Sequence, residues 1–173
     1  ILATDPDLIL ARYSGLTQEE YDRLSTIAPV VAYAGEPWSG EWRDIVRTTG
    51  KAMGRSADAE VLIAETEAKI AEARLAHPEF EDKTFSFAGG LSGDANTLGL
   101  YVSTDPRVQL VEDIGLTLAD GVKALPIDQG FSFPVSLENL SSVDADIFIA
   151  WLNDETGFDF VEDNPLMSRY RPV

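Results

Sequence analysis

The sequence predicts an α/β protein built from two lobes. Short apolar runs alternate with amphipathic segments in the first third of the chain, and the same alternation restarts in the second half. A long stretch with helical pattern and few apolar residues lies between the two regions. Strands that alternate with helices are typical of α/β folds, so this order favours two bodies joined by one helix.

The first alternating region begins with two short apolar runs. Leu8–Ala11 and Pro29–Tyr33 have the length and composition of buried parallel strands. Between them, Thr17–Glu20 has the pattern of a capping box, which opens a short helix. Residues 41–53 repeat their apolar side chains with the period of a second helix.

A longer helix is predicted over Ser56–Ala76 and is stopped by Pro78. Its thin apolar stripe suits a spine between two lobes better than a core helix. In the helix before it, Trp42 lies on the apolar face and is assigned to the core. Arg43 points away from that face and is expected in solvent.

The second half of the chain begins with a predicted strand over Thr84–Ala88, which is followed by a glycine-rich loop, Gly89–Gly93. Further strands and helices are predicted from apolar runs and helix boundary signals. These are the strand Leu98–Val102, the helix Pro106–Ile114, a helix begun by Val135–Leu140, the buried strand Asp146–Trp151 and the terminal helix Pro165–Tyr170.

Composition excludes several classes of function. The chain has 13 Lys and Arg against 30 Asp and Glu, for a net charge of −17. Such a surface repels phosphate backbones, so we expect no nucleic acid as partner, and the acidity favours a monomer. There is no cysteine and one histidine, His77, which is expected to be a helix C-terminal cation or a solvated residue. We therefore predict no protein-held metal and no intrinsic cofactor.

Several segments, taken in order, resemble ferric-siderophore-binding proteins of ABC importers. They are Asp5-Pro6-Asp7-Leu8-Ile9-Leu10-Ala11, Leu24-Ser25-Thr26-Ile27-Ala28-Pro29-Val30-Val31, Trp42 followed by Gly50-Lys51-Ala52-Met53-Gly54, and Val135-Ser136-Leu137-Glu138-Asn139-Leu140 followed by Asp144-Ala145-Asp146-Ile147-Phe148. The resemblance covers nearly the whole chain.

This resemblance implies two Rossmann-like lobes joined by one rigid helix, truncated here at both ends, with a ferric siderophore held in the cleft between the lobes. Residues 1–55 would be the later part of the N-terminal lobe, 56–77 the spine and 78–173 most of the C-terminal lobe. It further implies delivery to an ABC permease and an extracytoplasmic location, either periplasmic or lipid-anchored at the outer face of the cell membrane. Iron would enter only as the siderophore complex.

The ligand-binding residues are predicted from a rule of open α/β sheets, in which ligands bind beyond the carboxyl ends of strands. A ferric siderophore, usually anionic, needs cations, hydrogen-bond donors and aromatic faces. The predicted residues are Arg12, Tyr13, Trp38, Tyr101, Trp151 and Asn153. For Arg12 an ion pair with a nearby acid is an equal alternative, and for Trp151 core packing is one.

Glu138 stands where this family carries a glutamate that docks on the permease; the alternative is a simple interaction with a helix N-terminus. No catalytic residue is predicted. Gly90-Leu91-Ser92-Gly93-Asp94 lacks the second glycine of a nucleophile elbow. The alternative cargoes are haem and cobalamin on the same fold, and a less favoured alternative is an α/β hydrolytic enzyme.

Overall fold

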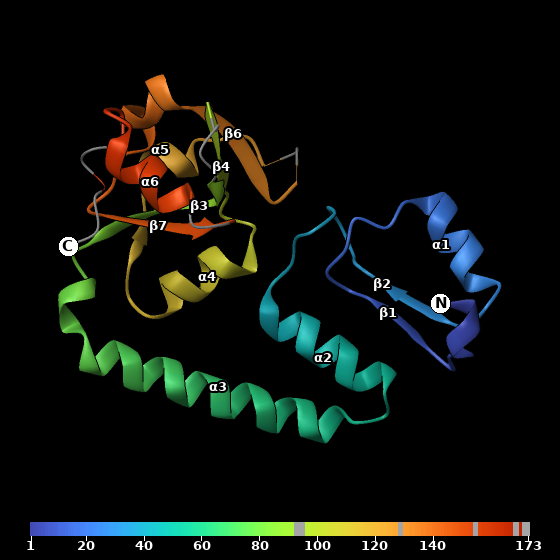
Figure 1. Cartoon of the computed structure of the whole chain (residues 1–173). Helices are drawn as coiled ribbons and strands as arrows, with labels where there is room; N and C mark the ends of the chain where they lie inside the picture. The colour runs from blue at the N-terminus through green and yellow to red at the C-terminus, as the bar shows by residue number, and fades with distance from the viewer. Residues whose placement is uncertain (92–95, 128–129, 154–155, 168–169, 171–173) are drawn as a thin grey trace. The chain divides into compact units, whose positions relative to one another are not determined.

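A computed structural model of the chain describes residues 1–91, 96–127, 130–153, 156–167 and 170 (Figure 1). The chain divides into two compact units, Ile1–Ala71 (unit 1) and Glu72–Val173 (unit 2). Both contain strands and helices, and the predicted mixed α/β class is confirmed.

Unit 1 is organised around a pair of parallel strands. β1 and β2 pair in register, with Ile9 beside Val30 and Ala11 beside Ala32. The capping box predicted at Thr17 forms, because its hydroxyl accepts from the Glu20 N–H while the Glu20 carboxylate accepts from the Thr17 N–H. The elements of the unit are η1 (Leu2–Thr4), β1 (Ile9–Ala11), α1 (Gln18–Ser25), β2 (Val30–Ala32), α2 (Trp42–Ala52) and α3 (Ser56–Ala76), whose last turn belongs to unit 2.

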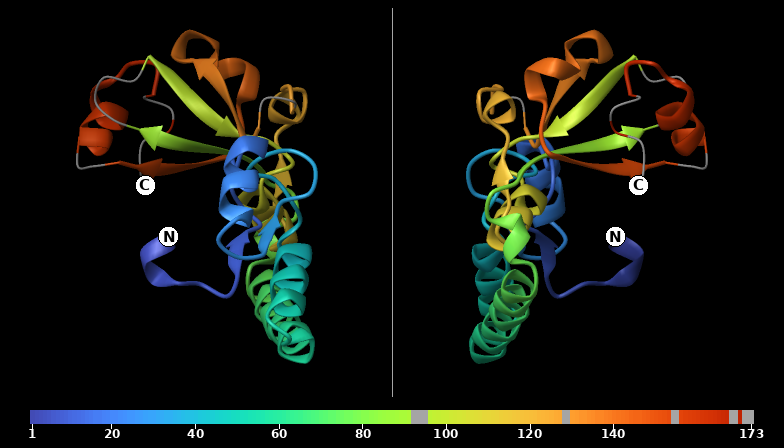
Figure 2. Two further views of the ribbon diagram at one scale, coloured as in Figure 1. Left: turned by 90° about the vertical axis from the view of Figure 1, so that its right-hand side faces the viewer. Right: turned by 90° about the vertical axis from the view of Figure 1, so that its left-hand side faces the viewer.

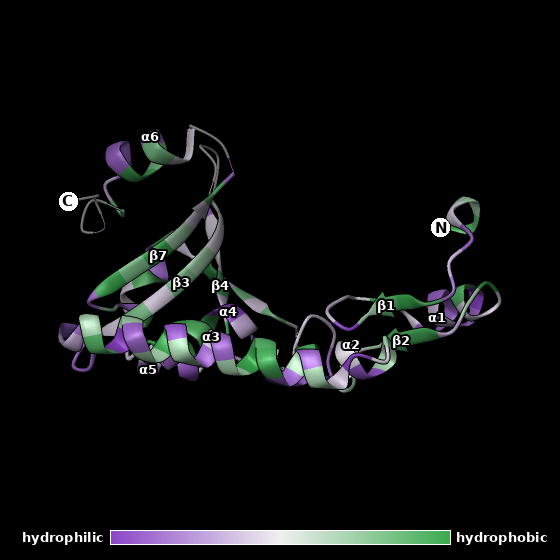
Figure 3. Ribbon diagram, turned by 90° about the horizontal axis from the view of Figure 1, so that it is seen from below, coloured by the Kyte–Doolittle hydropathy of each residue, from purple (hydrophilic) through white to green (hydrophobic). Residues whose placement is uncertain are grey.

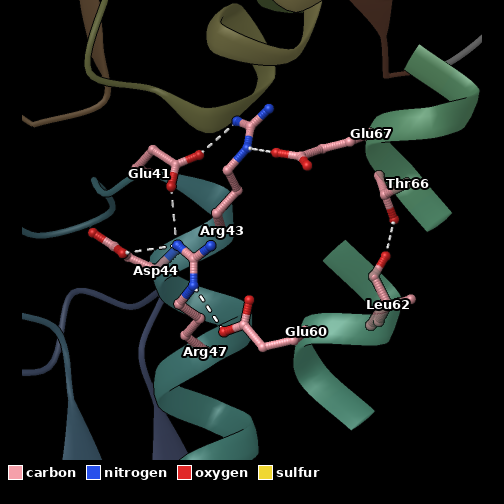
Figure 4. Close-up of polar contacts among 8 residues, drawn as sticks. All are labelled: Glu41, Arg43, Asp44, Arg47, Glu60, Leu62, Thr66 and Glu67. Atoms are coloured by element: carbon pink, nitrogen blue, oxygen red, sulfur yellow. Dashed lines mark hydrogen bonds and ion pairs between the residues drawn. The ribbon is translucent and has the colours of Figure 1, made fainter. Parts of the chain in front are cut away.

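A row of ion pairs joins α2 to α3 (Figure 4). Arg43 Nε lies 2.6 Å from Glu67 Oε1, and Arg47 Nε lies 2.9 Å from Glu60 Oε1. Arg43 also reaches Glu41 Oε1 through Nη1 at 2.8 Å. Since each arginine lies on α2 and Glu60 and Glu67 lie on α3, these ion pairs link the two helices.

Two expectations for α2 were wrong. Trp42 is half-buried rather than core, and the Arg43 guanidinium lies 4.4 Å above its ring centre. Arg43 is accordingly held by carboxylates and an aromatic face, and is not simply solvated. Partial burial would raise the pKa of Glu41, but hydrogen bonds from Arg43 and the Asp44 N–H outweigh it and hold that pKa below its usual value.

The long helix α3 forms over the range that the sequence predicts, Ser56–Ala76. Polar and apolar residues alternate along it, whereas β1, β2 and β7 are mostly hydrophobic (Figure 3). Only Ala59 and Ile63 of this helix are buried. Its role as an inter-lobe spine, with boundaries at residues 56 and 77, stays a prediction.

Unit 2 contains a five-stranded mixed sheet. β3 is the central strand of this sheet. It pairs in parallel with β7, in parallel with β5 at its first residues and antiparallel with β4 nearer its end. β4 pairs in turn with β6, also antiparallel. The elements are η2 (Pro78–Phe80), β3 (Thr84–Leu91), β4 (Thr97–Tyr101), α4 (Pro106–Asp113), β5 (Thr117–Leu118), α5 (Asp120–Lys123), β6 (Ser132–Ser136), η3 (Leu137–Val143), β7 (Ile147–Leu152) and α6 (Thr156–Asp163).

The main hydrophobic core of the described residues lies in unit 2, where helices pack against a curled sheet (Figure 2). Phe85, Leu100 and Leu118 are fully buried. The starts of β3 and β7 are clasped together, because the Asp146 carboxylate accepts from both the Thr84 N–H and the Thr84 hydroxyl. These two hydrogen bonds lower the pKa of Asp146.

Several boundaries in unit 2 differ from the prediction. Gly89 and Gly90 continue β3 instead of opening a loop, and Ser92 and Gly93 lie outside the described residues. Val135 lies in strand β6, which ends at Ser136, and only then does a 3₁₀ helix begin, capped by the Ser136 hydroxyl. β7 is half-buried rather than buried, since β3 is the one described strand with which it pairs.

The predicted C-terminal helix is also displaced. Residues 165–167 form a turn, residues 168–169 lie outside the described part, and the helix of this region is α6, Thr156–Asp163. Pro165 follows the helix end instead of starting a helix, a common position for proline. The sequence analysis missed α6. It also missed β5, α5 and β6, which are each only two to five residues long.

We predict that Gly121→Ala lowers the stability of unit 2 by about 2 kcal/mol, a usual cost of overpacking. A Cβ at Gly121 would lie 1.7 Å from the Ser142 carbonyl oxygen and 3.1 Å from the Val143 Cα, so backbone would have to move. Thermal or urea denaturation measures the effect. Gly99→Ala is the matched control, because its nearest neighbour is the Ser132 hydroxyl at 3.7 Å. Equal stability of the two variants would contradict the packing described for α5 and η3.

Candidate functional site

In unit 1 the predicted residues Tyr13 and Trp38 meet beyond the carboxyl ends of β1 and β2. Their rings are edge to face, with centroids 5.5 Å apart. Trp38 has a positive φ of 55°, which is uncommon for a bulky residue, and its N–H donates to the Ser14 carbonyl at 3.0 Å. The indole lies over Gly15, where a Cβ would be 2.4 Å from Trp38 Nε1. The ring is 40% exposed, so the pair presents an aromatic face to solvent.

Arg12 begins the same loop but is partly engaged by the backbone. Its Nη1 donates to the Ala32 carbonyl at 3.1 Å, which links the ends of the two strands. Its Nε is buried without a hydrogen-bond partner in the described part of the chain. No described carboxylate lies within ion-pair distance of Arg12, so the acid partner considered from the sequence is not found there.

In unit 2 the sheet register gathers aromatic side chains on one face. Because Ala88 pairs with Leu100, Phe87 stands opposite Tyr101, and their rings meet edge to face at 5.1 Å. The Trp151 ring lies 6.1 Å from Phe87, and that of Phe131 lies 6.0 Å from Tyr101. Trp151 is 55% exposed, whereas Tyr101 is 7% exposed. We call Phe87, Tyr101, Phe131 and Trp151 the aromatic surface of unit 2.

Gly89 and Gly90 make room for this surface. A Cβ on Gly89 would lie 2.2 Å from the Tyr101 hydroxyl oxygen, so a side chain there would displace the phenol ring. Gly90 has a φ of 76°, and the strand register shifts between Ala88 and Leu91. The bulge brings the backbone near exposed Asn153, whose Nδ2 would be 3.8 Å from a Gly90 Cβ.

Arg107 covers one end of the aromatic surface of unit 2. Its guanidinium carbon lies 3.7 Å from the Tyr101 ring centre and 5.5 Å from that of Phe131. Asp105, which is fully buried and caps α4, accepts from Arg107 Nε at 2.8 Å and from Nη2 at 2.7 Å. The Arg107 side chain remains 33% exposed. A planar, oriented cation is thus placed beside the rings.

The structure brings the predicted residues together within each unit. Tyr13 touches Trp38 in unit 1, and Tyr101 and Trp151 are linked through Phe87 in unit 2. The sequence analysis missed Arg107, Phe87 and Phe131. Arg107 was detectable, because it opens the helix that follows strand β4, at the kind of strand end that selected the other residues. Phe87 needed the sheet register, which the sequence does not provide.

Glu138 is exposed in the first turn of η3, and its N–H donates to the Ser136 hydroxyl at 3.4 Å. His77 is exposed, stacks on Phe80 and pairs with Glu79 through Nδ1 at 2.9 Å, as expected for a solvated residue. That contact lowers the pKa of Glu79. Within the described residues, no three His, Asp or Glu side chains are grouped to hold a metal ion, and no helix has the length and apolarity to cross a membrane.

Comparison with known proteins identifies the family. The model of the periplasmic binding protein family matches residues 1–172, so the chain belongs to that family, whose members bind substrates rather than convert them. A search of curated protein sequences found no match.

Solved structures agree with this assignment. The chain is 34% identical to PiaA, the substrate-binding protein of an iron uptake ABC transporter from Streptococcus pneumoniae TIGR4, with a TM-score of 0.80 over 97% of this chain and 58% of PiaA. For PiaA in complex with ferrichrome the TM-score is 0.83, over 97% and 57%. A periplasmic solute binding protein from Mycobacterium smegmatis str. MC2 155 is 25% identical, with a TM-score of 0.78 over 98% and 56%. The chain spans less than two thirds of each of these proteins.

We predict that Gly15→Ala displaces the Trp38 indole, because the new Cβ would meet Trp38 Nε1. The emission spectrum and near-ultraviolet circular dichroism of Trp38 should change. Since the chain has three tryptophans, each spectrum is taken as a difference against the same protein carrying Trp38→Phe. An unchanged Trp38 signal in the Gly15→Ala variant would show that the indole does not lie over this glycine.

Proposed function

We propose that this protein is the capture component of an ABC importer, and that it binds a ferric siderophore at the aromatic surfaces of its two units. Residues proposed to contact the ligand are Arg12, Tyr13, Trp38, Tyr101, Trp151 and Asn153, as the sequence predicts, together with Arg107 and Phe131 from the structure.

The observation that carries this proposal is the exposure of oriented aromatic faces beside strand ends. Trp38 and Trp151 remain 40% and 55% exposed although each is held by a neighbouring ring. Burying them against a ligand would remove apolar area from water, which is favourable by about 25 cal/mol per Å². A ferric siderophore suits such faces, because its own oxygen atoms already saturate the iron and its outer shell is partly apolar.

Hydrogen-bond donors complete the proposed site. The guanidinium of Arg107 lies at the aromatic surface of unit 2, the Asn153 amide lies beside the bulge at Gly90, and Arg12 lies at the start of the Tyr13 loop. Such donors suit the metal-bound and carbonyl oxygens that a siderophore presents. The 34% identical protein PiaA, solved with ferrichrome, supports the same class of ligand.

After capture, the proposed protein would deliver its ligand by docking on a permease, with exposed Glu138 as one contact. This role places it outside the cytoplasm, in the periplasm or anchored at the outer face of the cell membrane, and as a monomer. It would perform no chemistry on the ligand, so its activity is equilibrium binding and release.

A titration of tryptophan fluorescence with ferric siderophores, haem and cobalamin tests this proposal. We expect saturable quenching by at least one ferric siderophore. Trp38→Ala and Trp151→Ala should each weaken binding about tenfold, a usual effect of removing an aromatic residue from the centre of an interface. Trp42→Phe is the control, because Trp42 lies on α2, stacks against Arg43 and is not among the residues proposed to contact the ligand.

A response to haem or cobalamin alone would change the cargo and keep the binding role. Absence of binding by every compound, in protein whose circular dichroism shows it to be folded, would overturn the proposed function.

For docking, we predict that Glu138→Gln leaves the dissociation constant of the ligand unchanged but slows uptake by cells about tenfold or more. The reason is that truncating one partner of a charge pair at an interface often weakens the binding free energy by about 2–5 kcal/mol. Uptake of radiolabelled ferric siderophore measures this effect. Glu72→Gln, at an exposed position of α3, is the matched control. Equal uptake by both variants would remove Glu138 from the docking surface.

A further inference from the structure

Arg107 is the cation at the aromatic surface of unit 2, and Tyr101 supports it. The Arg107 guanidinium carbon lies 3.7 Å from the Tyr101 ring centre. The phenol is itself held close to strand β3, because a Cβ at Gly89 would lie 2.7 Å from Tyr101 Cζ. Tyr101 is 7% exposed, whereas the Arg107 side chain is 33% exposed. Within this stack, the group best placed to meet a ligand is therefore the guanidinium.

Stacking on a ring sets the height of a guanidinium but leaves its direction within the plane of the stack open. The Asp105 carboxylate supplies a direction, since Oδ1 accepts from Arg107 Nε at 2.8 Å and Oδ2 accepts from Arg107 Nη2 at 2.7 Å. Two parallel hydrogen bonds of this kind fix the relative orientation of the two planar groups. Because the carboxylate lies against the edge formed by Nε and Nη2, the donors on Nη1 point away from it.

Asp105 is itself anchored at the start of α4. It is fully buried, and its Oδ1 accepts from the Arg107 backbone N–H at 2.8 Å as the cap of that helix. A carboxylate fixed at a helix start is a rigid support for the long arginine side chain beside it. Because Asp105 is buried, any effect that it has on a ligand at the surface must pass through a neighbour.

We propose that Asp105 is a positioning residue for ligand binding, which holds the Arg107 guanidinium in the direction in which it donates to the siderophore. This inference rests on the proposed function, in which Arg107 contacts the ligand, and it adds a residue that acts through Arg107. The benefit is preorganisation, because a side chain that is already oriented loses less conformational freedom when the ligand binds. Asp105 thus raises the affinity without touching the ligand.

Asp105→Asn separates this role from helix capping. Asparagine keeps an oxygen that can cap α4, but its amide nitrogen is a donor and cannot accept from Arg107 Nη2. Asp105→Ser is a second variant, because serine also caps helices and its single oxygen cannot form the two parallel hydrogen bonds. Circular dichroism and thermal melting show which variants are folded at the temperature of the titration.

The test is a double-mutant cycle on the dissociation constant, measured by fluorescence titration with ferrichrome and with every other ferric siderophore that quenches the unmodified protein. Arg107→Lys keeps a cation beside the buried carboxylate but loses the planar fork. We expect Asp105→Asn to weaken binding about fivefold and Arg107→Lys about tenfold, with the double variant within about twofold of Arg107→Lys alone. Asp120→Asn is the control, because it removes an exposed carboxylate at the start of α5, and it should leave the dissociation constant unchanged.

A nuclear magnetic resonance signal reports on the guanidinium in the absence of ligand. The Arg107 Nε–H resonance, assigned by its loss in the Arg107→Lys protein, should shift and exchange faster with water in the Asp105→Asn protein, because the carboxylate no longer accepts from it in the same geometry.

Three results would overturn the inference and leave the proposed function standing. They are an unchanged Arg107 Nε–H resonance in folded Asp105→Asn protein, an unchanged dissociation constant in that protein, and an equal loss of affinity from Asp105→Asn in the Arg107→Lys background. The last result would show that Asp105 acts independently of Arg107. Failure of the unmodified protein to bind any ferric siderophore would instead overturn the proposed function, and the role of Asp105 in binding with it.

Discussion

The buried carboxylate of Asp105 is the interaction on which the candidate site in unit 2 depends. It caps α4 by accepting from the Arg107 N–H, and the same oxygens hold the Arg107 guanidinium above Tyr101. One side chain thus begins a helix, orients a cation and cancels its charge. A buried carboxylate without these partners would be costly, so the pairing stabilises this part of unit 2 as well as setting the shape of the surface.

The two units build comparable aromatic surfaces by different means. In unit 1 a tryptophan in the left-handed region is held by one backbone hydrogen bond and packs over Gly15. In unit 2 the register of three strands aligns Phe87, Tyr101 and Trp151, and Gly89 leaves space for the phenol. In both cases glycine provides the room. In unit 1 the position is the carboxyl ends of the two strands, the usual location of ligands in open α/β sheets, whereas in unit 2 it is set by the sheet register.

Local signals in the sequence were enough to predict the fold class, the capping box at Thr17, the long helix Ser56–Ala76 and the two parallel strands of unit 1. They failed where long-range pairing decides the structure. Gly89 and Gly90 looked like a loop because their place in β3 depends on Tyr101, which lies on another strand. Arg107 was missed because its importance comes from a ring and a carboxylate brought together by folding, although its position after a strand could have been noticed.

The most direct test of the account is to locate the bound iron by nuclear magnetic resonance. Paramagnetic Fe(III) in a hydroxamate chelate broadens the signals of nearby protons, whereas diamagnetic Ga(III) in the same chelate does not. A signal that broadens with iron but not with gallium therefore comes from a proton close to the metal, and not from a conformational change on binding. The account predicts that the indole signals of Trp38 and Trp151 broaden with iron and that the indole signal of Trp42 does not. Selective broadening of the Trp42 signal, with those of Trp38 and Trp151 unchanged, would contradict it.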